Sequence, residues 1–102
     1  MPQKPVNNDA MHGWETDDSK VLFQAILKLK TVKECEDFFR DLMTLSELNE
    51  MAERFKIARL LDQGLSYGKT AKKTATSTTT VSRVAHWLRH GRGGYQTILD
   101  RM

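Results

Sequence analysis

The 102-residue sequence predicts an all-α protein organised around a helix-turn-helix. Apolar residues recur at spacings of three and four over residues 19–62, which is the period of amphipathic helices. Two short helical patterns separated by a turn follow over residues 66–88, the arrangement of a helix-turn-helix. Ser and Thr stand just before these helices, where a hydroxyl accepts a bond from an otherwise unpaired backbone N–H.

The chain is predicted to hold an arm and one domain. Residues 1–17 contain two prolines, asparagines and scattered charges without a helical period, so we expect a flexible arm there. Residues 18–102 form the domain, with dimerisation helices over 18–63, the helix-turn-helix over 66–89 and a glycine hinge with a last helix over 91–102.

Three helices are predicted before the helix-turn-helix. The first runs from Ser19 to about Leu29 on its apolar period. Capping boxes open the next two helices, Thr31 with Glu34 and Thr44 with Glu47. Gly64 is expected to end the longer one. The apolar stripes are broad for so short a chain, which favours a homodimer over the alternative of a compact monomeric bundle.

Ser66 and Ser77 are predicted to cap the two helices of the helix-turn-helix. Ala71 supplies the small residue needed where the two helices cross closely. On the second helix, one face is apolar: Val81, Val84, Ala85 and Leu88. The opposite face is polar: Thr79, Ser82, Arg83 and His86. An ordinary surface helix rich in threonine is the alternative to a reading helix.

Short hydroxyl side chains and arginine are suited to DNA, because they bond phosphates and base edges and arginine can bond guanine twice. The candidate DNA-binding residues are Ser77, Thr78, Thr79, Ser82, Arg83 and His86 of the second helix and Lys69, Lys72 and Lys73 of the first. Residues 1–50 hold 6 Lys or Arg against 10 Asp or Glu, whereas residues 51–102 hold 10 against 3. This positive half coincides with the helix-turn-helix, which favours double-stranded DNA as the partner.

Other classes of protein are disfavoured. Cys35 is the one cysteine, so an internal disulfide is impossible and a cytoplasmic location is expected. No apolar run has the length of a membrane span. His86 and His90 are spaced to share a metal, but no third ligand is evident, so neither a metal nor a cofactor is expected. No phosphate loop, nucleophile elbow or catalytic carboxylate pair is present, and an enzyme is not expected.

The chain from about Asp18 to Arg101 resembles the YerC/YecD branch of the Trp repressor superfamily, especially in LKTVKECEDFFRDLMTLSEL, ERFKIARLLDQGLSY, STTTVSRVAHWL and HGRGGYQTILDR. The resemblance implies a Trp-repressor-like helical bundle, an intertwined dimer of about six helices per chain, and paired reading heads that regulate transcription. Within the branch's pattern, three residues are unusual and should weaken the reading heads: Gly68, Thr70 and Ala75.

The resemblance also implies a possible effector pocket. The tryptophan-binding members use a threonine, two arginines, a glycine and a serine, and Thr44, Arg54 and Arg83 occupy the first three places. Val84 replaces the glycine and Trp87 the serine, which adds bulk where an indole ring would lie. Tryptophan is therefore not expected to bind.

The sequence thus predicts a sequence-specific DNA-binding transcriptional regulator that reads the major groove as a homodimer. The alternative is a helical protein-interaction module that keeps the fold without specific DNA binding.

Overall fold

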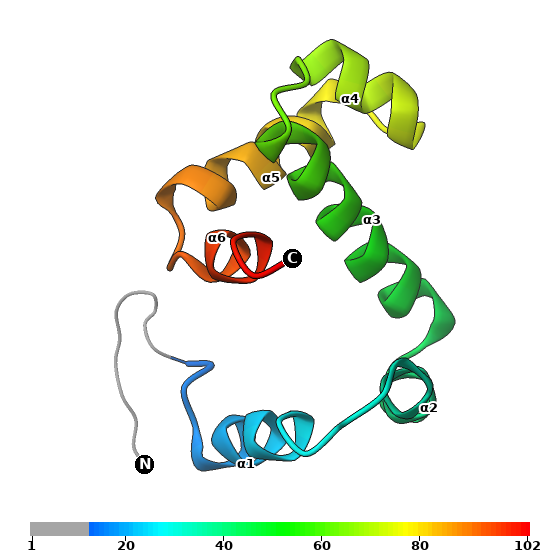
Figure 1. Ribbon diagram of the computed structural model, residues 1–102, viewed down its shortest axis with the longest axis vertical. Helices are drawn as coiled ribbons and strands as arrows, with labels where there is room; N and C mark the ends of the chain where they lie inside the picture. Colours follow the sequence, from blue (N-terminus) through cyan, green and yellow to red (C-terminus); the bar gives the residue numbers. More distant parts are fainter. Residues whose placement is uncertain (1–12) are drawn as a thin grey trace. The chain divides into compact units, whose positions relative to one another are not determined.

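The computed structural model describes residues 13–102, which form six helices and no strand (Figure 1). The helices are α1 (Asp17–Ile26), α2 (Val32–Leu42), α3 (Leu45–Asp62), α4 (Tyr67–Thr74), α5 (Thr78–His90) and α6 (Gly94–Leu99). The all-α prediction is confirmed. Most of the predicted arm lies outside the described residues. Among the described residues, no helix combines the length and the apolar composition that crossing a membrane requires.

The chain divides into two compact units, Met1–Leu42 and Met43–Met102. The boundary between the units falls inside residues 18–63, the segment predicted to hold the dimerisation helices. The first unit contains α1 and α2, and the second contains α3 to α6.

Helix α1 begins and ends earlier than its apolar period predicts. Thr16 caps it in a reciprocal pair with Ser19: the Ser19 N–H donates to the Thr16 hydroxyl at 3.0 Å, and the Thr16 N–H donates to the Ser19 hydroxyl at 2.9 Å. A serine therefore closes a box that usually carries Glu or Gln. The helix ends at Ile26, so Leu29 lies beyond it.

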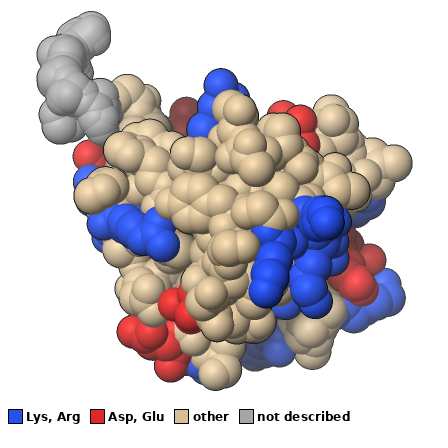
Figure 2. Space-filling view, turned by 90° about the horizontal axis from the view of Figure 1, so that it is seen from above, with Lys and Arg blue, Asp and Glu red and all other residues tan. Residues whose placement is uncertain are grey.

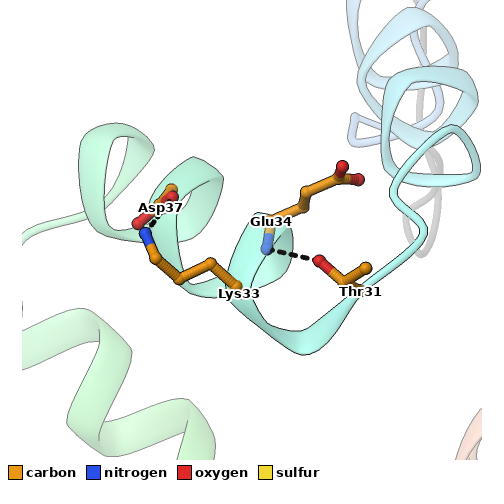
Figure 3. A network of polar contacts seen from close by, with 4 residues as sticks. All are labelled: Thr31, Lys33, Glu34 and Asp37. Atoms are coloured by element: carbon orange, nitrogen blue, oxygen red, sulfur yellow. Dashed lines mark hydrogen bonds and ion pairs between the residues drawn. The ribbon is translucent and has the colours of Figure 1, made fainter.

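Helix α2 starts with a modified form of the predicted capping box (Figure 3). The Glu34 N–H donates to the Thr31 hydroxyl at 3.0 Å, as predicted. The Glu34 carboxylate accepts from the Lys30 N–H at 2.9 Å, one residue before the position that a capping box uses. Lys33 and Asp37 form an exposed ion pair at 2.7 Å one turn apart, which contributes roughly 0.3–0.5 kcal/mol.

The first unit has no buried residue in either helix. Large apolar side chains are exposed instead: Val21 is 62% exposed, Leu27 84% and Val32 76%. Phe38 and Phe39 contact each other edge to face, with ring centroids 5.6 Å apart, and remain half-buried. Cys35 is likewise only half-buried. Helices α1 and α2 therefore have amphipathic sequences, but their apolar side chains are not buried in a core.

The second unit holds the buried core, where α3, α4 and α5 pack on one another. Its buried apolar residues are Ile57, Ala58, Leu61, Ala71, Val81, Val84 and Ala85. Ala71 lies at the predicted crossing of the two shorter helices and is 7% exposed, so the small residue is needed there. Helix α6 folds back onto α3 and α5, and Tyr95 packs against the core.

Two of the three unusual residues of α4 and its turn, Thr70 and Ala75, lower the stability of the folded chain. Thr70 is fully buried and its hydroxyl has no hydrogen-bond partner among the described residues, an arrangement that costs about 1–3 kcal/mol. Ala75 has φ 54°, in the left-handed region that favours glycine. The sequence prediction of a strained turn is therefore confirmed at Ala75.

Replacing Ala75 by Gly should stabilise the chain by about 1 kcal/mol, because glycine adopts positive φ without a Cβ clash. Urea unfolding at one fixed protein concentration measures this change. Gly64 has φ 96° and open space around its Cα, so Gly64→Ala is the matched control and should destabilise by a similar amount. An Ala75→Gly chain no more stable than the parent would contradict the proposed strain.

Candidate nucleic-acid interface

Helix α5 is held by its cap at one end and by its apolar face along its length. The Thr80 N–H donates to the Ser77 hydroxyl at 3.1 Å, so the predicted cap is present. Val81 is fully buried, and Val84 and Ala85 are 5% and 1% exposed. With this face fixed in the core, the rotation of the helix about its own axis is set.

The polar face of α5 is consequently exposed. Its exposed residues are Thr78, Thr79, Ser82, Arg83 and His86. None of these five carries a negative charge, and all five end in groups that can donate hydrogen bonds to phosphates or base edges. Ser77 differs from the other predicted residues, because its hydroxyl is already engaged with Thr80 within the helix.

Helix α4, which packs against α5, carries three exposed lysines. Its exposed basic residues are Lys69, Lys72 and Lys73. Ser66 caps the helix by accepting from the Lys69 N–H at 3.2 Å, as predicted. Figure 2 views the chain from the side on which α4 lies in Figure 1 and shows Lys and Arg side chains exposed at the surface. No Asp or Glu lies between Asp62 and Asp100, so no acidic residue within that segment offsets this charge.

None of the described hollows is lined by all three residues of the predicted effector pocket, which are Thr44, Arg54 and Arg83. Thr44 caps α3: it accepts from the Glu47 N–H at 3.1 Å and donates its own N–H to the Glu47 carboxylate at 2.9 Å. This backbone bond, helped by the Thr44 hydroxyl, lowers the pKa of the Glu47 carboxyl. Arg54 and Arg83 are exposed on α3 and α5.

A hollow does lie between α3, α5 and α6, but its walls are different residues: Phe55, Trp87, Gly91, Arg92, Gly94, Tyr95 and Ile98. Trp87 is 60% exposed and lies at its edge, whereas Val84 is buried in the core. Val84 and Trp87, the two bulky replacements, therefore fit into the structure. The described hollows include none that Thr44, Arg54 and Arg83 line together.

The histidines of α5 lie close together. The rings of His86 and His90 have centroids 5.2 Å apart, and the His86 ring also meets Trp87 edge to face. Over residues 13–102, however, no group of three or more potential metal ligands occurs. The structure thus offers this pair no third protein ligand in the part of the chain that it describes.

One contact of the α4–α5 pair was missed by the sequence analysis. Arg89 Nη1 donates a hydrogen bond to the Tyr67 hydroxyl oxygen at 2.8 Å. The two residues are 22 positions apart, and no periodicity or capping rule connects them. Only their basic and aromatic character could have drawn attention to them.

These features define a small all-α protein that exposes a basic pair of crossing helices. The chain matches the family described as Trp repressor protein over residues 17–102, and it belongs to that family. The family is one of regulators rather than enzymes.

Three similar proteins place the chain more closely. The uncharacterized protein YerC of Bacillus subtilis is 42% identical over 94 residues, which are 92% of this chain and 88% of that protein. The crystal structure of a TrpR-like protein from Eubacterium eligens has 39% identity and a TM-score of 0.82, covering 93% of this chain and 94% of that one. A solved structure from Staphylococcus aureus has 35% identity and a TM-score of 0.82, covering 96% and 95%. The resemblance to the YerC/YecD branch and the Trp-repressor-like fold are thereby confirmed.

Free tryptophan should not bind this chain, because Val84 and Trp87 stand where the smaller glycine and serine of the tryptophan-binding members would be. Isothermal titration calorimetry with sub-millimolar tryptophan should show no heat of binding. A clear binding heat would contradict this prediction, as would a gain in DNA affinity when tryptophan is added.

Proposed function

We propose that the protein is a sequence-specific DNA-binding transcriptional regulator that acts in the cytoplasm as a homodimer and reads the major groove with α4 and α5 as a helix-turn-helix. The observation that carries the proposal is the exposed face of α5, which carries hydroxyl groups and Arg83, together with the exposed lysines of the helix α4 that packs against it. Helix-turn-helix proteins insert the second helix into the major groove while the first crosses the backbone. Membership of the Trp repressor family supports this assignment.

The experiment that tests the function is selection of duplexes from a random-sequence library with the purified chain. A specific regulator enriches a common motif and binds it more tightly than a duplex with the same composition in scrambled order. Binding to both duplexes should weaken as salt rises, because lysine and arginine release counterions from phosphates. Recovery of no common motif would contradict the proposal.

The homodimer is supported by the exposed apolar side chains of the first unit. A segment whose two helices bury no residue gains too little from apolar burial to offset the entropy of ordering its backbone. A second copy presents the same exposed faces, and closed two-fold pairing covers them on both chains at once. Two reading heads also double the contacts with a duplex.

A helical protein-interaction module is the second candidate function. The observation in its favour is the same exposed apolar surface, with Leu27 at 84% and Val32 at 76% exposure. Such a module, however, gives no reason for the basic, acid-free surface of α4 and α5. The duplex selection separates the two functions, since an interaction module enriches no sequence.

Arg83→Ala and Lys72→Ala should impair DNA binding in different ways. Arg83 is proposed to contact a base edge, so its loss should cost roughly 1 to 3 kcal/mol on the selected duplex and relax the preference at one base pair. Lys72 is proposed to hold a phosphate, so its loss should weaken all duplexes alike and reduce the salt slope by about 1 for each reading head.

Fluorescence anisotropy on the selected and scrambled duplexes over a range of salt measures both effects. Lys56→Ala is the control, because this exposed lysine belongs to α3 and not to the α4–α5 pair that is proposed to contact DNA. If Arg83→Ala and Lys72→Ala lower affinity equally for both duplexes and change the salt slope equally, the assigned roles are wrong.

The homodimer should be visible by light scattering at micromolar concentration and moderate salt, as a mass of twice 11.7 kDa. Leu27→Asp should shift the population toward monomer, because it places a charge on an exposed apolar position of the proposed interface. Gln24→Asp adds the same charge at an exposed polar position of α1 and should have a smaller effect. A monomeric wild-type chain would rule out the homodimer.

A further inference from the structure

The α4–α5 pair is joined at two separate places. The turn over residues 75–77 connects the end of α4 to the start of α5. Tyr67 is the first residue of α4 and Arg89 lies in the last turn of α5, so their contact ties together the two helix ends that the turn leaves apart. Between these places, Ala71 of α4 and Ala85 of α5 both belong to the buried apolar cluster.

The Tyr67–Arg89 contact is suited to hold a fixed geometry. Arg89 Nη1 donates to the Tyr67 hydroxyl at 2.8 Å, and the guanidinium carbon lies 5.9 Å from the centre of the tyrosine ring. The charged donor strengthens the hydrogen bond, and the planar guanidinium restricts its direction.

We infer that the Tyr67–Arg89 contact is a positioning element that fixes the crossing angle of α4 and α5, and thereby the specificity of DNA reading. This inference rests on the proposed function. Both helices also pack on α3, which holds their inner faces, but Ala71 and Ala85 present little surface where the two helices meet each other. The Tyr67–Arg89 contact adds an attachment at the helix ends that the turn leaves apart.

The crossing angle matters more for specific than for non-specific binding. A specific complex needs the lysines of α4 on phosphates and the polar face of α5 on base edges at the same time. Non-specific binding depends on phosphate contacts alone, which tolerate a range of angles. Loss of the Tyr67–Arg89 contact therefore lowers affinity for the selected duplex more than for the scrambled one. Without the contact, α4 and α5 sample a wider range of crossing angles, and specific binding must restrict that range again.

Tyr67→Phe tests this directly, since it removes the accepting oxygen while keeping the ring and the net charge. We expect a threefold to tenfold loss of affinity for the selected duplex, the size of about one hydrogen bond, and less than a twofold change for the scrambled duplex. The salt slope should stay unchanged, because no cation is lost. Tyr95→Phe is the matched control, since Tyr95 lies on α6, outside the α4–α5 pair.

Arg89→Lys and Arg89→Gln complete the test. Lysine keeps the charge and a donor, so Arg89→Lys should retain more of the discrimination between the duplexes than Arg89→Gln. In the Tyr67→Phe background, Arg89→Gln should cause no further loss of discrimination, although the lost charge still weakens binding to both duplexes. Thermal unfolding of each variant shows whether the changes reflect folding.

The outcomes separate this inference from the proposed function. If the wild-type chain prefers the selected duplex and Tyr67→Phe leaves that preference intact, the positioning role is wrong while the function stands. Equal losses on both duplexes, or the same loss with Tyr95→Phe, would also overturn it. A wild-type chain without any sequence preference would overturn the proposed function and this inference with it.

Discussion

The close crossing of α3, α4 and α5 is the contact on which the rest of the second unit depends. Ile57 and Val81 are fully buried there, and alanines at positions 58, 71 and 85 allow the backbones to approach. Helix α4 has only 8 residues, fewer than an isolated helix needs to be stable in water. It is therefore helical because it is packed, and the lysines that it presents are positioned by a core of small residues.

The same crossing concentrates unfavourable features in one place. The buried hydroxyl of Thr70 and the positive φ of Ala75 both belong to α4 and its turn. Local unfolding begins where stabilising contacts are fewest, so we expect α4 to exchange its amide protons faster than α3.

The helices and their caps could largely be predicted from the sequence, because apolar period and capping are local properties. Ser66, Ser77 and the Thr44–Glu47 pair cap their helices as predicted. The cap at Thr16 was missed because Ser19 takes the place of the usual acidic residue. The apolar face of α5 was predicted from its period, but the Tyr67–Arg89 contact depends on the crossing angle, which no local pattern encodes.

The absence of buried residues in α1 and α2 has a consequence for how the cell sets the activity of this protein. In the proposed homodimer, the exposed apolar side chains of these helices are covered only when two chains meet, and the amount of dimer grows with the square of the free chain concentration at low levels. Unpaired chains keep apolar segments open to proteases. Under the proposed function, a small change in synthesis would then cause a larger change in the number of occupied DNA sites.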